Sequence, residues 1–224
     1  MTALERPEVR RVLDRLFAER AAQRSRVVSH VARSIVDRVL GREPSLDEEV
    51  ERLSAHYASV SPRQGRFLYM VARSIRARWI VEFGTSVAIS TIYLATAVRD
   101  NGGGRVIGSE MNHGKLAAAR DNIAAAGLAD LVEIREGNAL ETFVTIDAKI
   151  DLLFLDGFPP LYLPLVKLLL PHLRPGAVVI ADNIFTHLRL LRPYRQFLRD
   201  ASNGFQSETL FMRYGVEYSV RMSP

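Results

Sequence analysis

Acidic and amide residues follow two apolar runs of the sequence, and this pattern could build a metal site. Asp156 follows the apolar run 151–155, and the pair Asp182 and Asn183 follows the run 177–181. Two carboxylates and one amide oxygen are hard ligands suited to Mg²⁺ or Ca²⁺, with open positions for waters or a bidentate substrate. Each residue alone could equally be a helix N-cap or a turn residue, so the metal prediction depends on their combination.

A second set of residues could bind a nucleoside. Gly84 would allow the backbone to approach a ligand closely, and Ser90 beside a helix N-terminus offers hydrogen-bond donors. Glu110 comes some 26 residues after Gly84, where an acidic residue can accept both hydroxyls of a ribose. Asn138, next to Gly137, could meet an adenine edge. The alternative for each is an ordinary turn, cap or solvated strand end, because tight turns also favour these residue types.

A parallel sheet would place these residues together. From Trp79 onward, short apolar runs alternate with helical stretches, which is typical of successive βαβ units. Ligands of such sheets bind where strand order reverses, at the carboxyl ends of the strands. The predicted strands are 79–83, 105–109, 131–135, 150–155 and 177–181, and the predicted helices are 87–98, 113–126, 160–173 and 187–200. The segments 205–212 and 216–221 flank a Gly-containing turn and predict an antiparallel hairpin at the sheet edge.

The first 60 residues predict amphipathic helices. Apolar residues recur at helical spacing in 9–17 and again in 27–39. Ser45 with Glu48 resembles a capping box, and Ser61-Pro62 resembles another helix start. The apolar faces must pack on the domain or on a second subunit, and we expect a homodimer.

Composition excludes several classes of protein. The chain has 224 residues, 48% of them hydrophobic, which suits one domain with a substantial core. It has no cysteine, which excludes disulfides, thiolate nucleophiles and zinc sites that use sulfur. Its apolar runs are far shorter than the roughly 20 residues of a membrane span. The start lacks the apolar core of a secretory signal, so we expect a soluble, cytoplasmic protein without a membrane partner.

The net charge of +5 could suggest nucleic-acid binding, but its distribution argues otherwise. Between Glu5 and Glu43, ten Arg face six acidic residues, which accounts for +4 of the total. Only three of the 30 basic residues are Lys, so the Arg excess is a property of the whole chain and not a local adaptation to phosphate. We therefore expect no nucleic-acid partner.

With these residues placed, the chain from about Ser61 to Arg221 resembles the class I, S-adenosylmethionine-dependent O-methyltransferases of the catechol and caffeoyl-CoA type, especially their bacterial relatives. Six motifs carry the resemblance: VEFGTSVAIST (81–91), GRVIGSEMN (104–112), AARDNIAAAGL (118–128), EIREGNALE (133–141), LLFLDG (152–157) and LRPGAVVIADN (173–183). Each motif is common alone, whereas all six in this order and at these spacings are specific.

The resemblance implies a fold and a domain division. The fold would be a Rossmann-like methyltransferase fold, α/β, with a doubly wound, mostly parallel sheet of seven strands in the order 3-2-1-4-5-7-6. The last strand would be antiparallel, and a helical extension would precede the sheet. Residues 1–60 would form an N-terminal helical arm for dimerisation or for covering the substrate, and residues 61–224 would form the domain that binds S-adenosylmethionine.

The resemblance also implies roles for individual residues. The expected cofactor site comprises Glu82, Gly84, Thr85, Ser86, Ser90, Glu110, Met111, Gly137, Asn138, Ala139 and Asp156. Asp156, Asp182 and Asn183 would bind Mg²⁺, or Ca²⁺ or Mn²⁺. The activity would be methyl transfer from S-adenosylmethionine to a hydroxyl of a small phenolic or catechol-like acceptor, with Asp156 acting in catalysis.

The chain departs from the family pattern at three positions. Ala88 and Asn138 stand where the family usually has Gly and Asp, and Pro159 replaces a Lys that is assigned as the base in catechol enzymes. His187, five residues after Asp182, is the candidate catalytic base, because an unperturbed His titrates near pH 6.5; a surface His without function is the alternative.

Three functions therefore stay open at the level of sequence. The first is a metal-assisted O-methyltransferase with an aromatic acceptor wall that could include Phe158, Tyr162, Phe185 and Tyr214. The second is a methyltransferase that acts without metal on nitrogen or on a non-catechol oxygen. The third is a non-catalytic module that binds a cofactor or nucleic acid.

Overall fold

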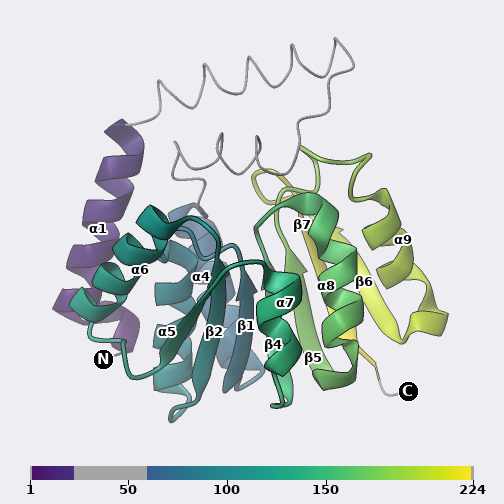
Figure 1. The fold of residues 1–224 in the computed structure, drawn as a ribbon, viewed down its shortest axis with the longest axis horizontal. Helices are drawn as coiled ribbons and strands as arrows, with labels where there is room; N and C mark the ends of the chain where they lie inside the picture. Colours follow the sequence, from purple (N-terminus) through teal and green to yellow (C-terminus); the bar gives the residue numbers. More distant parts are fainter. Residues whose placement is uncertain (1, 23–59, 223–224) are drawn as a thin grey trace.

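The computed structural model describes residues 2–22 and 60–222. Seven strands of this part form one sheet in the order β3-β2-β1-β4-β5-β7-β6 (Figure 1). The strands are β1 (Trp79–Phe83), β2 (Arg105–Glu110), β3 (Val132–Glu136), β4 (Ile150–Leu155), β5 (Leu173–Ala181), β6 (Phe205–Leu210) and β7 (Val216–Arg221). The first five are parallel, and β7 runs antiparallel to both β5 and β6. The predicted fold class, strand order and edge hairpin are confirmed.

Helices cover both faces of the sheet (Figure 1). The α-helices are α1 (Pro7–Ala22), α4 (Pro62–Ser74), α5 (Ile89–Asp100), α6 (His113–Ala125), α7 (Ala139–Thr142), α8 (Tyr162–Leu169) and α9 (Arg192–Arg199). Short 3₁₀ helices are η1 (Ala3–Glu5), η2 (Phe143–Thr145), η3 (Pro159–Leu161), η4 (Leu170–His172) and η5 (Ala201–Asn203).

Alternation along the strands creates two hydrophobic cores, because successive side chains of a strand point to opposite faces. In β4, Leu152 and Phe154 join the core beneath α1, α4, α5 and α6. Leu153 and Leu155 join the core beneath α7, α8 and α9. Strand β4 and the second half of β5 are therefore buried on both faces, which explains why these segments are almost continuously apolar.

Helix α1 packs on its own domain. Its buried residues Val9, Val12, Leu13 and Leu16 belong to the same core as the sheet. Polar contacts reinforce this position, since Arg15 donates to Asn122 of α6 at 2.6 Å. The apolar face of α1 is thus covered within the chain and gives no support to a dimer. The predicted helix over 27–39 and the capping box at Ser45 and Glu48 lie outside the described residues, as does most of the predicted arm.

Two predicted boundaries were wrong. The predicted helix 187–200 begins only at Arg192, because residues 184–191 form turns that pair with the β6–β7 connection through the Phe185 N–H and the Tyr214 carbonyl. Strand β5 begins at Leu173, four positions before its apolar run, because Ile150 of β4 already pairs with Leu173 across an irregularity in register. Ser61 caps α4 as predicted, with Gln64 completing the capping box.

None of the helices within residues 2–22 and 60–222 is long and apolar enough to cross a membrane.

Candidate active site

The predicted ligand residues share one edge of the sheet because four strands end in register. Phe83 of β1 pairs with Ser109 of β2 and with Leu155 of β4, and Leu155 pairs with Ala181 of β5. The next residue along each of these strands is Gly84, Glu110, Asp156 and Asp182, respectively. Backbone bonds continue the ladder one step further, from Asp156 N to the Phe83 carbonyl at 2.9 Å and from Asp182 N to the Leu155 carbonyl at 3.0 Å. The site is therefore positioned by the sheet itself.

Gly84 lies where the strand order reverses, between β1 and β4. Its φ is +95°, and a Cβ at this position would lie 2.7 Å from the Gly157 nitrogen and 2.8 Å from the Asp156 carbonyl oxygen. A side chain would push β1 and β4 apart at the crevice where such sheets bind ligands. Only glycine permits both the backbone conformation and the close approach.

Glu110 is held ready to accept further hydrogen bonds. Its Oε2 accepts from Ser86 N and its Oε1 from Asn112 N, each at 2.8 Å. Each carboxylate oxygen has about two acceptor sites, so each can accept one further hydrogen bond, as the predicted contact with a ribose requires. The half-buried carboxylate is fixed by the β1–α5 turn on one side and by the β2–α6 turn on the other.

Two buried oxygens beside Gly84 lack a partner among the described residues. They are Glu82 Oε1 and Ser86 Oγ. The other oxygen of Glu82 accepts from Thr91 Oγ1 at 2.5 Å and from Thr85 Oγ1 at 3.4 Å. Burial raises the pKa of Glu82 to about 7, although the Thr91 hydroxyl opposes the shift. Because buried polar atoms are normally hydrogen-bonded, these two oxygens fit a cofactor that carries an ammonium or hydroxyl group.

The residues around this turn have structural duties as well. Thr85 is buried and donates its N–H to the Ser109 carbonyl at 3.1 Å. Ser90 is buried in the first turn of α5. Ala88 caps α5 with a left-handed φ of +70°, and its methyl group belongs to the hydrophobic core under α5. A left-handed conformation costs a non-glycine residue about 1–2 kcal/mol, which explains why glycine is usual at this position in the resembled family.

The β3–α7 connection carries the residues predicted near an adenine. Gly137 has a φ of +116° and donates to the Glu110 carbonyl at 3.0 Å, which brings β3 beside β2. Asn138 caps α7 by accepting from Leu140 N at 3.1 Å, and Ala139 is buried. The side chain of Met111 is 41% exposed. Asn138 thus has a structural role, and its amide NH₂ lies 3.4 Å from Glu141.

Asp156, Asp182 and Asn183 meet at the ends of β4 and β5. The Asn183 amide donates to Asp156 Oδ1 at 2.7 Å, and Asn183 N donates to Asp182 Oδ1 at 2.8 Å. Asn183 holds a left-handed φ of +67°, which turns its side chain back toward Asp156. The predicted metal ligands are therefore in contact with one another, although the contacts alone do not assign them a cation.

Electrostatics at this pair favours a positive ligand. Burial, the Asp182 charge and the Glu82 charge raise the pKa of Asp156 well above its ordinary value. Burial also raises the pKa of Asp182, against the opposing hydrogen bonds from Asn183 and Gln64. Within the described residues, no three His, Asp, Glu or Cys side chains gather as a metal site. The donor set is instead two carboxylates and one amide, which suits an oxygen-preferring cation that keeps some of its waters.

The predicted base His187 lies in the turn that follows Asn183. Its backbone N–H donates to the Asn183 carbonyl at 3.2 Å, and its Nδ1 lies 2.9 Å from the Thr186 hydroxyl. Pro159 opens the 3₁₀ helix η3 and is buried, so it presents no base. Lys167 lies on α8, where its ammonium group packs over the Phe197 ring at 5.5 Å.

The structure adds two residues that the sequence interpretation missed. Gln64 of α4 donates to Asp182 Oδ2 at 2.8 Å. Arg213, in the β6–β7 turn, stacks over the Tyr214 ring at 4.3 Å, and its charge opposes the upward pKa shifts of both aspartates. The capping box at Ser61 gave a signal for the helix-capping role of Gln64, but nothing local signals a contact across 118 positions.

Comparison with known proteins gives a consistent result. A methyltransferase domain family matches residues 81–184. Catechol O-methyltransferases from Niastella koreensis and Mycobacterium tuberculosis are each 36% identical to this chain, over 137 and 127 residues. The matches cover 59% and 56% of this chain and 61% and 57% of those relatives. A Bacillus cereus O-methyltransferase solved in complex with SAH superposes with a TM-score of 0.69 at 28% identity, over 84% of this chain and 96% of that one.

Over the matched residues, the chain is thus similar to catechol O-methyltransferases, and it shares its fold with solved O-methyltransferases. With this similarity, the in-register edge of β1, β2, β4 and β5 is the candidate active site. The matches span about three fifths of the two catechol O-methyltransferases.

Proposed function

We propose that this chain is a class I O-methyltransferase of the catechol and caffeoyl-CoA type, which transfers a methyl group from S-adenosylmethionine to a hydroxyl of a small phenolic or catechol-like acceptor, assisted by Mg²⁺ or, in its place, Ca²⁺ or Mn²⁺. The observation that carries the proposal is the shared edge of the sheet. There, Glu110 ends β2, Glu82 and Ser86 lie on either side of the Gly84 turn at the end of β1, and Asp156 and Asp182 directly follow β4 and β5. Among the described residues, Glu82 Oε1 and Ser86 Oγ are buried without a hydrogen-bond partner.

Each of the proposed cofactor residues would contact a different part of S-adenosylmethionine. Glu110 would accept the ribose hydroxyls, while the Gly137-Asn138-Ala139 connection would border the adenine. Glu82 and Ser86 would meet the polar end of the methionine moiety, and Gly84 would leave space for the backbone to approach it. An acidic residue favours the ammonium group of methionine only while it is ionised, so cofactor affinity should increase as the pH rises through the Glu82 pKa of about 7.

Asp156, Asp182 and Asn183 would hold the cation. The Asn183 amide nitrogen now faces Asp156, so its amide group would have to turn to present oxygen to a metal. A bound divalent cation would supply a Lewis acid that lowers the pKa of the acceptor hydroxyl. The carboxylate pair would fix the acceptor at the edge of the sheet. Exposed Phe185 and Tyr214 could border it, whereas Tyr162 is fully buried and cannot.

The proposed reaction is a direct transfer of the methyl group from sulfur to oxygen. The acceptor oxygen, once its proton is removed, forms a C–O bond to the methyl carbon as the S–C bond of the sulfonium breaks, which leaves S-adenosylhomocysteine. Holding the two reactants in line would contribute to the rate enhancement by making the step effectively unimolecular. His187 is our proposed proton acceptor, because it follows the metal ligand Asn183 in the same turn and Pro159 supplies no base.

Calorimetric titration with S-adenosylhomocysteine tests the cofactor site. We expect Glu110→Gln to weaken binding by about tenfold or more, since one oxygen cannot accept from Ser86 N, Asn112 N and two ribose hydroxyls together. Glu136→Gln is the matched control, because Glu136 pairs with Glu110 in register but is exposed. Equal losses in both variants would refute the ribose assignment.

Removing the metal tests its assistance. Catechols and other hydroxylated aromatics are screened with Mg²⁺, after EDTA treatment, and with the Asp182→Ala variant. We expect turnover to require the cation and Asp182. Activity that survives both changes would instead favour a metal-independent methyltransferase, which the hydrogen bond between Asn183 and Asp156 would suit.

The homodimer is also a proposal. Because α1 is buried against its own domain, a dimer would depend on surfaces other than the apolar face of that helix. Light scattering of the full chain at several concentrations would test it, and a monomer mass throughout would contradict it.

A further inference from the structure

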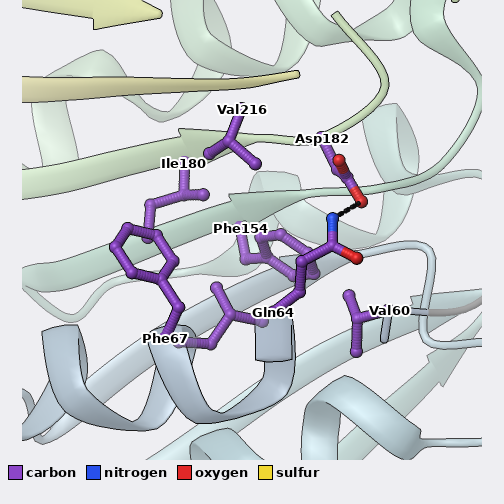
Figure 2. Close-up of a pocket in the computed structure, with 8 residues that line it drawn as sticks. Val60, Gln64, Phe67, Phe154, Ile180, Asp182 and Val216 are labelled. Carbon is purple, nitrogen blue, oxygen red and sulfur yellow. Dashed lines mark hydrogen bonds between the residues drawn. The ribbon is translucent and has the colours of Figure 1, made fainter. Parts of the chain in front are cut away.

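Gln64 joins the start of helix α4 to the candidate metal ligand Asp182 (Figure 2). Its Nε2 donates to Asp182 Oδ2 at 2.8 Å. Its Oε1 accepts from the backbone nitrogen and the hydroxyl of Ser61, each at 3.0 Å. Both side chains are buried, with 3% of Gln64 and 4% of Asp182 exposed, so water competes little for these bonds.

The partners of Gln64 determine which way its amide points. The Ser61 N–H requires an acceptor, and the Asp182 carboxylate requires a donor, so only one orientation of the amide satisfies both. The second oxygen of Asp182 accepts from Asn183 N at 2.8 Å. Each oxygen of Asp182 thus has one neutral donor that fixes the carboxylate without cancelling its charge, and each keeps acceptor capacity for a cation.

Among the described residues that line the small cavity beside Gln64 and Asp182, no other side chain is a hydrogen-bond donor, although the Arg20 and Arg213 charges also act on Asp182. A cavity of about 10 Å³ beside Gln64 and Asp182 is otherwise lined by apolar side chains, among them Phe67, Phe154 and Ile180 (Figure 2). This is roughly the volume that one water requires. An Asp182 oxygen that lost the Gln64 amide would face this apolar wall and would be free to rotate away from Asp156.

We propose that Gln64 is a positioning residue that holds Asp182 in the orientation for binding a divalent cation, and that it does so with a neutral donor. The inference rests on the proposed metal assistance and deepens it. It also links the entry of the chain into α4 to the metal site, because the same amide caps the helix.

Binding of Mn²⁺ to the full chain, without cofactor or acceptor, tests this role. Binding is measured as the decrease of the electron spin resonance signal of free Mn²⁺. We expect Gln64→Met, which has similar size but no N–H, to weaken Mn²⁺ affinity at least tenfold. The control Ser61→Ala removes a capping hydroxyl and leaves the Gln64 amide in place. It should lower stability and leave Mn²⁺ affinity within about twofold of wild type.

A second variant keeps the test decisive if Gln64→Met does not fold. Gln64→Glu retains an acceptor for the Ser61 N–H but, when ionised, has no N–H to donate to Asp182 and repels it. We expect Mn²⁺ to raise its unfolding midpoint by less than it raises that of wild type. Unchanged Mn²⁺ affinity in Gln64→Met, or equal midpoint shifts for Gln64→Glu and wild type, would overturn the inference alone. A wild-type chain that binds no Mn²⁺ would overturn metal assistance as well.

Discussion

The Glu82 carboxyl is enclosed at the end of β1, and this enclosure makes folding pH-dependent. The folded state raises its pKa from 4.5 to about 7 through burial. The folded chain therefore binds a proton more tightly than the unfolded chain does between these two values. The contribution of Glu82 to stability should therefore fall as the pH rises across that window and then level off, because an acid with a raised pKa loses its contribution on ionisation.

The variant Glu82→Gln should abolish this part of the pH dependence. A shift from 4.5 to about 7 corresponds to about 3 kcal/mol. Relative to wild type, the variant should therefore gain up to about 3 kcal/mol of unfolding free energy between pH 4.5 and pH 8. Urea denaturation without cofactor at a series of pH values measures the difference. Parallel curves for the two proteins would show that Glu82 titrates normally in the folded state.

At the scale of elements, ion pairs to one buried carboxylate hold α9 against the edge hairpin. Glu217 of β7 is fully buried, and Arg199 of α9 donates to it at 2.8 Å. Arg195 lies 3.5 Å away, and the hydroxyl of Ser207 in β6 donates at 2.9 Å. The strand that closes the sheet beside β5 thus carries a charge that only a correctly docked α9 can neutralise.

Removing that charge should be costly. Glu217→Ala leaves two arginines without their shared partner, but these arginine side chains are 26% and 38% exposed and stay in contact with water. We therefore expect a loss of about 1–3 kcal/mol, below that of a fully buried ion pair. Chemical denaturation measures the loss. Glu208→Ala is the matched control, since Glu208 is exposed on the neighbouring strand β6, and it should change stability by less than about 0.5 kcal/mol. Similar losses in both variants would contradict the account.

At the scale of the whole molecule, the sheet was predictable because both of its faces are covered. Parallel strands that are buried on both faces are mostly apolar, so an apolar run such as 150–155 was sufficient to predict a strand. The start of α9 was not predictable. Residues 184–191 have helix-forming composition, but their backbone bonds to the β6–β7 turn, as between Ile184 and Gly215, a contact set by tertiary structure.

The candidate site was predictable where it depends on strand ends and not where it depends on long-range contacts. Asp156 and Asp182 could be found because each directly follows an apolar strand, and Glu110 because it ends β2. Gln64 and Arg213 could not, since their positions relative to the aspartates depend on how α4 and the β6–β7 turn pack. Their residue types are ordinary for a helix start and a turn.

A cofactor site built across four strands should stabilise the whole domain. S-adenosylhomocysteine at 100 times its dissociation constant should add about 3 kcal/mol. For a domain of this size, that corresponds to a rise in Tm of roughly 5–10 °C. Thermal unfolding followed by circular dichroism measures it. Glu110→Gln at the same ligand concentration should show a smaller rise, and a rise equal to that of wild type would contradict the assigned ribose contact.

The in-register edge also determines where the chain can accept an insertion and where it cannot. The glycine turn 102–104 lies at the amino end of β2, and a side chain at Gly102 or Gly103 would meet nothing within 4 Å. Insertions there should leave catalysis untouched. One extra residue within β4 would instead reverse the facing of every side chain beyond it, Asp156 included. We therefore expect that relatives with other acceptors differ in the loops between helices and strands. The strands that position the proposed site residues should keep their register, because a change of register would displace those residues.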